Sequence, residues 1–157
     1  MESTMSNNVK PIPDDYPGIT PYLVVKGAAR AMDFYQKAFG AKEIMRFDQP
    51  DGRIGHAEMQ VGDARFMLAD EFPEMKIFSP QTLGGTSTYF LIYVKDVDAL
   101  FNRAVSAGAK VDKPVADQLY GDRNGTLIDP FGHKWTIATH IEDVSPEEME
   151  RRMHAAK

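Results

Sequence analysis

A histidine and a glutamate two positions apart are the residues of this sequence best placed for acid–base chemistry. His56 and Glu58 lie in the segment GHAEMQVGDARFMLA. Because residues i and i+2 of a strand share one face, the imidazole and the carboxylate could act as a catalytic acid–base pair. A hydrogen-bonded polar pair lining a cavity or a subunit interface would show the same spacing. The pair could also supply two ligands to a divalent metal. The sequence shows no convincing third ligand, so a metal cofactor is possible but is not predicted.

Tyrosines and one arginine could bind a small-molecule substrate. Tyr22, Tyr89 and Tyr93 could line an aromatic pocket, although packing between structural units would use the same residues. Tyr120 and Arg123 precede the last predicted hairpin. A guanidinium can hold an anionic group with two parallel hydrogen bonds. An ion pair between Arg123 and a neighbouring aspartate is the alternative.

The other histidines give weaker indications of function. His133 stands beside a tight turn predicted at DPFG, which favours a structural role. His140 ends the last predicted strand and could face the same cavity as Arg123. His154 lies in a charged tail, where we expect it to be solvated. The sequence has no P-loop, no GxGxxG motif and no Ser-His-Asp order typical of hydrolases, so those chemistries are not expected.

Composition and charge exclude several classes of partner. The chain has 157 residues, 43% of them hydrophobic, and a net charge of −5. There is therefore no basic surface to attract nucleic acid or an anionic membrane. No apolar run approaches the ~20 residues of a membrane-spanning helix, and we expect no secretory signal. The absence of cysteine excludes disulfides and thiolate metal sites and fits a reducing cytoplasm.

The elements that must position these residues occur twice. TPYLVVKGAARAMDFYQKAFGAK at 20–42 resembles YFLIYVKDVDALFNRAVSAGAK at 89–110, and ARFMLA lies 69 positions before HKWTIA. Apolar periodicity and turn residues predict the order β-α-β-β-β in both halves. The elements predicted for the first module are 19–25, 27–39, 41–47, 54–61 and 64–69. Those predicted for the second module are 88–94, 97–107, 109–113, 125–128 and 133–140.

The chain divides into a lead-in, one α+β domain of two modules, and a tail. The boundaries that we expect are 1–18 for a flexible lead-in, 19–140 for the domain and 141–157 for a helical tail. Within the domain they are 19–70 for the first module, 71–86 for a linker loop and 87–140 for the second module. One helix covers only one face of a small sheet. The open face of each module must therefore meet a ligand, the other module or a second subunit.

The turn between the third and fourth strands predicts which residues lie on that open face. A two-residue turn pairs Glu58 with Met67, and opposed residues of a hairpin share a face. His56 and Glu58 are therefore predicted on the open face beside Met67. The matching stretch of the second module offers Arg123 and Gly125.

Four motifs carry a resemblance to a known family. They are AMDFYQKAFGAK, GHAEMQVGDARFMLAD, VKDVDALFNRAVSAGAKV and GDRNGTLIDPFGHKWTIATH, and they span about 18–140. The chain resembles the vicinal oxygen chelate superfamily of glyoxalase I, extradiol dioxygenases and bleomycin-resistance proteins, and is similar to its PhnB-type, glyoxalase-like branch. The resemblance implies paired βαβββ modules, a U-shaped mixed sheet around a cavity, and homodimers that can exchange modules.

The resemblance also implies where metal ligands would stand. Metal-dependent members carry them on the first and last strands of each module, and the matching positions here are Thr20, Met67, Tyr89 and Thr136. None offers the carboxylate or imidazole that divalent metals prefer, so the standard glyoxalase I and extradiol dioxygenase activities are not expected. The resemblance instead implies a glyoxalase-like protein that acts on or binds a small polar or anionic metabolite. A non-catalytic binding protein of the bleomycin-resistance type is the alternative.

Overall fold

The computed structural model describes residues 8–156, which form two modules of the same topology. The first module contains β1 (Tyr22–Val25), α1 (Ala28–Phe39), β2 (Lys42–Asp48), β3 (Ile54–Val61) and β4 (Ala64–Asp70). The second contains β5 (Tyr89–Tyr93), α3 (Val97–Ala107), β6 (Lys110–Asp117), β7 (Asp122–Ile128) and β8 (Lys134–His140). Between the modules lie η1 (Pro73–Met75) and α2 (Pro80–Leu83), and after them α4 (Pro146–Ala155).

The two sheets have matching strand orders. The first is β1-β4-β3-β2 and the second is β5-β8-β7-β6. β1 runs parallel to β4 and β5 parallel to β8, whereas the remaining pairs are antiparallel. This confirms the α+β fold of two βαβββ modules that the repeat predicts.

Local sequence signals account for the ends of the longer helices. α1 ends at Gly40, whose φ of 69° lies in the left-handed region and whose N–H donates to the carbonyl of Gln36. Asp96 caps α3 by accepting a hydrogen bond from the N–H of Ala99 at 3.1 Å. Ser145 caps α4 with the same kind of bond. All three residue types are among those preferred at these cap positions.

Several boundaries differ from those expected. β1 begins at Tyr22, and β6 and β7 reach Asp117 and Asp122, so their hairpin is longer than predicted. Pro114 lies within β6, which is an edge strand of its sheet and so tolerates a missing N–H. The predicted linker loop is partly helical, because Ser79 caps α2 and proline follows it at the first helical position.

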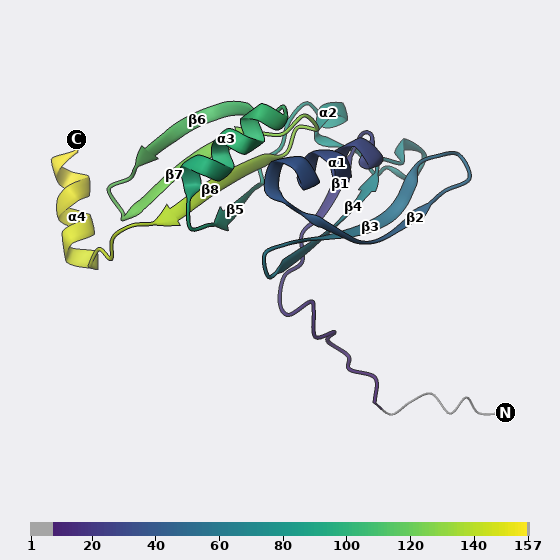
Figure 1. Cartoon of the computed structure of the whole chain (residues 1–157), viewed down its shortest axis with the longest axis horizontal. Coiled ribbons are helices and arrows are strands. Elements are labelled where there is room, and N and C mark those ends of the chain that lie inside the picture. The colour runs from purple at the N-terminus through teal and green to yellow at the C-terminus, as the bar shows by residue number, and fades with distance from the viewer. Residues whose placement is uncertain (1–7, 157) are drawn as a thin grey trace.

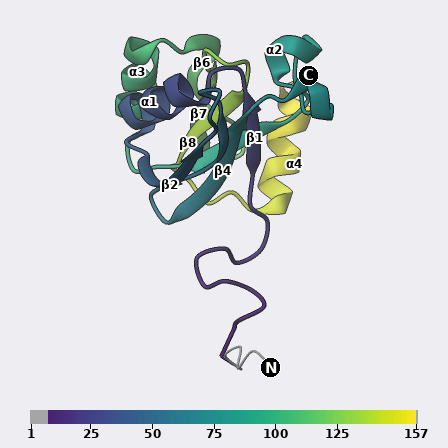
Figure 2. The same cartoon turned by 90° about the vertical axis from the view of Figure 1, so that its right-hand side faces the viewer.

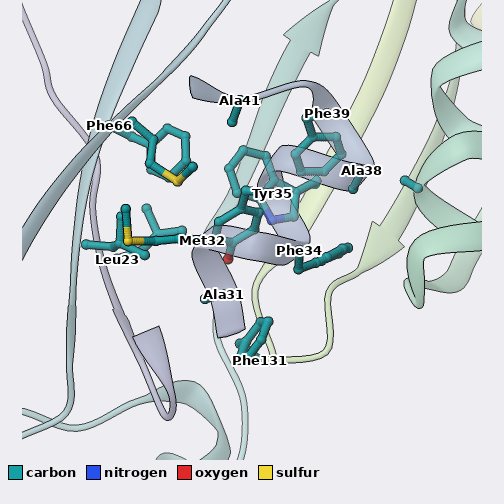
Figure 3. Close-up of a cluster of buried hydrophobic side chains, with 14 of the residues drawn as sticks. Leu23, Ala31, Met32, Phe34, Tyr35, Ala38, Phe39, Ala41, Phe66 and Phe131 are labelled. Atoms are coloured by element: carbon teal, nitrogen blue, oxygen red, sulfur yellow. The ribbon is translucent and has the colours of Figure 1, made fainter. Parts of the chain in front are cut away.

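One hydrophobic core joins the two modules (Figure 3). Tyr35 of α1 is fully buried and donates its hydroxyl to Asp129 at 2.6 Å. Trp135 of β8 donates its indole N–H to the same carboxylate at 2.9 Å. Because Tyr35 comes from the first module and the other two residues from the second, the modules are held as one body.

The helices α1 and α3 lie beside each other on one side of the two sheets and leave the other side open (Figures 1 and 2). Phe66 and Trp135 are buried beneath the helices, whereas Tyr89, Leu91 and Tyr93 are exposed on the open side. The described part of the N-terminal segment runs below the sheets, and α4 lies at the far end of the second sheet (Figure 1). Within residues 8–156, no helix is long and apolar enough to cross a membrane.

Candidate functional site

His56 and Glu58 share the open face of β3, as the hairpin register predicted. Glu58 lies opposite Met67. His56 Nε2 lies 2.8 Å from Glu58 Oε2, and the two side chains are 28% and 12% exposed. The carboxylate is thus largely shielded from solvent, while the imidazole remains open to a small molecule.

Two tyrosines extend this pair into a chain of four side chains. The hydroxyl of Tyr22 in β1 lies 2.8 Å from His56 Nδ1, and its ring centroid is 5.5 Å from that of the imidazole. The hydroxyl of Tyr16 donates to Glu58 Oε1. Each ring nitrogen of the histidine and each oxygen of the carboxylate therefore has a partner.

Hydrogen bonds keep Glu58 ionised. The hydroxyl of Tyr16, and then the imidazole of His56, hold the pKa of Glu58 below its ordinary value, although burial opposes them. An ionised carboxylate can only accept hydrogen bonds, so His56 Nε2 carries a proton. In the tautomer with this single proton, Nδ1 accepts a hydrogen bond from the hydroxyl of Tyr22. Burial and the charge of Glu58 raise the pKa of Tyr22, which keeps this phenol protonated at neutral pH.

Tyr16 belongs to the segment before β1, which the sequence predicts to be a flexible lead-in. The guanidinium carbon of Arg65 lies 5.6 Å from the centroid of the Tyr16 ring, and Arg65 Nη2 lies 3.5 Å from Asp15 Oδ2. Sequence reasoning missed Tyr16 because 42 positions separate it from Glu58. Its one signal was an aromatic residue in a polar segment outside the repeat.

A second hydrogen-bonded cluster lies on the open face of the second module. Asp122 accepts a hydrogen bond from the Tyr93 hydroxyl at 2.6 Å and lies 2.8 Å from His140 Nδ1. His140 Nε2 lies 2.7 Å from Asp143 Oδ1. Burial would raise the pKa of Asp122, but the bonds from Tyr93 and His140 outweigh it and hold that pKa low. Asp122, followed by Asp143, raises the pKa of His140.

The predicted counterparts of the pair, Arg123 and Gly125, lie on the helix side of β7. In β7 and β8, Thr126 pairs with Thr136. Thr136 stands 69 positions after Met67, which is the partner of Glu58 and is separated from Thr136 by the repeat distance. Thr126 is therefore the true counterpart of Glu58. The sequence comparison was one residue out of register, and a shift of one residue reverses the face of a strand.

The tip of the second module separates two of the predicted binding residues. Asn124, the counterpart of the histidine, lies on the open side and donates Nδ2–H to the hydroxyl of Tyr120 at 2.8 Å. Arg123 points the other way and pairs with Asp98 at 2.9 Å and Asp117 at 3.0 Å. The structure brings Tyr120 to the open side and leaves Arg123 in the ion pairs that were its alternative.

The three tyrosines of the predicted aromatic pocket all lie on open faces. Tyr22, Tyr89 and Tyr93 are 50%, 62% and 59% exposed. They do not pack between the modules. Tyr22 joins the cluster of the first module and Tyr93 that of the second.

A cavity of about 790 Å³ lies at the seam between the modules, within the usual size range of small-molecule sites. Its apolar wall includes Phe39, Phe66 and Trp135, and another part of its wall is formed by Tyr16 and Arg65. Tyr16 therefore both lines this cavity and bonds the carboxylate of Glu58.

The donor chemistry on the open faces does not fit a divalent metal. In the described part of the chain, no group of three or more His, Cys, Asp or Glu residues is placed to hold a metal ion. The positions implied by the resemblance offer hydroxyls and a thioether from Thr20, Met67, Tyr89 and Thr136. Thr136 Oγ1 already shares a hydrogen bond with Thr126 Oγ1 at 2.8 Å.

Known proteins resemble the chain in sequence. The family described as the Glyoxalase/Bleomycin resistance protein/Dioxygenase superfamily matches residues 18–137. An uncharacterized protein of Mycobacterium tuberculosis is 42% identical over 153 residues, which cover 96% of this chain and 86% of the relative.

Solved structures resemble the chain in fold. A gene product of Arabidopsis thaliana has a TM-score of 0.64 and 28% identity, over 78% of this chain and 98% of that one. A PhnB protein of Bacillus cereus has a TM-score of 0.62 and 18% identity, over 78% of this chain and 99% of that one. The second likeness concerns the fold alone.

Proposed function

Because the chain belongs to the glyoxalase/bleomycin resistance protein/dioxygenase superfamily, we propose that it binds a small polar or anionic molecule on its open faces and exchanges a proton with it. The observation that carries this proposal is the hydrogen-bonded chain Tyr22–His56–Glu58–Tyr16. Family membership supports small-molecule binding in general. The proton transfer rests on these four side chains.

His56 is the group that would exchange the proton. Its Nε2–H is held by ionised Glu58, which would stabilise the imidazolium formed when Nδ1 takes a proton. The half-exposed hydroxyl of Tyr22 occupies Nδ1. A ligand would therefore displace this hydroxyl or pass its proton through it. In this proposal Glu58 orients the imidazole, and His56 acts first as base and then as acid.

Exposed aromatic residues would supply the binding surface. Tyr22, Tyr89, Tyr93 and Tyr120 all expose a ring on the open side, and such rings combine a large apolar surface with a polar hydroxyl. Arg123 is the least suited of the predicted binding residues. It would have to leave its ion pairs on the helix side to reach a ligand.

We further propose that the protein forms a homodimer in which a second copy covers the open faces. Tyr89, Leu91 and Tyr93 are 62%, 47% and 59% exposed in the single chain. A partner would bury this apolar surface. It could also bring the Asp122–His140 cluster of one chain opposite the His56–Glu58 pair of the other.

Binding without turnover is the second candidate function. Two observations favour it: both ring nitrogens of His56 have partners within the protein, and the implied metal positions hold poor ligands. A protein of this kind would sequester its ligand unchanged.

Titration of the full chain with defined probes tests the proposal. The probes are lactate, pyruvate, methylphosphonate and benzoate. Their binding is detected by the melting temperature of the protein and by two-dimensional NMR. A bound probe should perturb resonances around His56 and raise the melting temperature. His56→Ala and Glu58→Gln should weaken its binding about tenfold, a loss typical of hydrogen bonds to charged groups. His154→Ala, at a side chain that is 68% exposed, should not.

Exchange of pyruvate methyl protons with D₂O separates the two candidates. Exchange catalysed by the wild type and lost in His56→Ala supports proton transfer. Binding without exchange supports sequestration. A probe that binds equally well to the wild type and to both site variants would contradict the proposed site.

A further inference from the structure

The N-terminal segment places a phenol in the proposed site. Tyr16 donates its hydroxyl to Glu58 and lies against the guanidinium of Arg65. The segment that carries it is mostly exposed and precedes the family domain, which begins at residue 18. Gly18 has a φ of 84°, and no atom lies within 4 Å of the point that a Cβ would occupy. The segment thus joins the domain through a loosely packed glycine.

The surroundings of this phenol have the features of a binding site. Ionised Glu58 accepts the hydroxyl proton in a charge-assisted hydrogen bond. Arg65 lies within cation–π distance of the ring. The seam cavity of about 790 Å³ opens beside Tyr16 and Arg65. Outward movement of Tyr16 would vacate a place beside both this cavity and Glu58, because Tyr16 contacts both.

We infer that the place now filled by the Tyr16 ring, beside Glu58 and Arg65, binds hydroxyaromatic molecules, and that Tyr16 occupies it as a built-in competitor. The inference rests on the proposed function, because it names a ligand class for the same site. An ionised carboxylate favours a hydroxyl donor over a second anion. The apolar wall formed by Phe39, Phe66 and Trp135 would accept substituents on the ring.

The competition is intramolecular and therefore effective. A side chain on a short flexible tether acts at an effective concentration of about millimolar. A free phenol of modest affinity would bind measurably only when Tyr16 is removed or driven out. A larger hydroxyaromatic ligand that also filled the seam cavity could displace Tyr16 at lower concentration.

p-Cresol, which is the tyrosine side chain as a free molecule, is the probe for this inference. Tyr16→Ala should bind p-cresol at least about tenfold more tightly than the wild type does, because it lacks the tethered competitor. The same variant should bind toluene, which lacks the hydroxyl, about tenfold more weakly than p-cresol. Trp135, the single tryptophan of the chain, lines the cavity, so its fluorescence reports binding together with NMR.

Ile12→Ala is the matched control, because Ile12 belongs to the same N-terminal segment, is 69% exposed and has no part in the proposed site. It should bind p-cresol no better than the wild type. Adding Glu58→Gln to Tyr16→Ala should abolish the preference for p-cresol over toluene. In the wild type, saturating p-cresol should shift the ring resonances of Tyr16 toward those of an exposed tyrosine, a result that requires no variant.

Equal binding of p-cresol and toluene by Tyr16→Ala would overturn the inference, as would unmoved Tyr16 resonances in the saturated wild type. The proposed function would survive either result, because His56-dependent proton exchange of pyruvate does not depend on a phenol. Conversely, selective p-cresol binding without any exchange would uphold the ligand class and remove the catalytic part of the proposed function.

Discussion

Single hydrogen-bond donors decide the charge of Glu58. Tyr16 and His56 hold its pKa low against the effect of burial. A carboxyl group whose pKa is lower in the folded than in the unfolded state stabilises the fold at pH values above its unfolded-state pKa. This contribution is lost as the pH falls through the folded-state pKa. The first module should therefore lose stability in acid when Glu58 becomes protonated.

Tyr16→Phe should raise the pKa of Glu58, because the variant keeps the ring and removes only the hydroxyl that donates to the carboxylate. The measurement is a ¹³C NMR titration of glutamate side-chain carboxyls from about pH 2 to 7, a range that spans the ordinary glutamate pKa. Tyr120→Phe, whose hydroxyl bonds Asn124 instead, should leave Glu58 unchanged. An unaltered pKa in Tyr16→Phe would contradict the role assigned to this hydroxyl.

His140 should make stability depend on pH in the opposite sense. Asp122 and Asp143 raise its pKa in the folded protein. The stabilisation is complete at pH values below the pKa of a histidine in the unfolded protein, about 6.5. It is lost as the pH rises through the pKa of His140 in the folded protein. His140→Gln should thus lower the free energy of unfolding more at about pH 5.5 than at about pH 8.5. Urea denaturation at both pH values measures this, with the exposed His154→Gln as control.

At the scale of elements, the loop between β7 and β8 joins the modules through one carboxylate. Asp129 Oδ1 accepts hydrogen bonds from the N–H groups of Phe131 and His133 at 2.8 and 3.0 Å. Its Oδ2 accepts the hydroxyl of Tyr35 and the indole N–H of Trp135. The DPFG segment is a tight turn, as the sequence predicts, but it is also the junction between α1 and the second sheet.

Asp129→Ala should lower the free energy of unfolding by about 3–5 kcal/mol, because buried donors from both modules lose their acceptor. Urea denaturation followed by circular dichroism measures the loss. Asp14→Ala, at a side chain that is 73% exposed, should change the stability by less than about 0.5 kcal/mol. A similar effect of the two substitutions would mean that the carboxylate does not hold the modules together.

At the scale of the whole molecule, the open faces of the single chain expose large apolar side chains to solvent. Leu91 is 47% exposed between two exposed tyrosines of β5. The wild type should therefore sediment as a dimer, and Leu91→Lys should shift it toward monomer, because an unpaired buried ammonium is unfavourable. Val105→Lys, a change at a 38% exposed residue of α3, is the control and should remain dimeric. A monomeric wild type would rule out the proposed homodimer.

Local patterns made much of the fold predictable. The repeat, the helix caps and the two-residue hairpin depend on neighbours in sequence, and the register of Glu58 with Met67 follows from the turn alone. The register of Arg123 and Gly125 could not be obtained in this way, because the longer hairpin between β6 and β7 and the start of β7 at Asp122 were not visible as local patterns.

The sequence by itself determined the two modules, their open faces and the placement of His56 beside Glu58, because backbone geometry and side-chain alternation act over a few residues. Only the tertiary structure decided which side chains complete that pair. Tyr16 and Tyr22 reach it from outside the hairpin, and Asp129 joins helix α1 of the first module to strand β8 of the second. Contacts of this kind depend on how distant segments pack, and neither residue spacing nor composition records them.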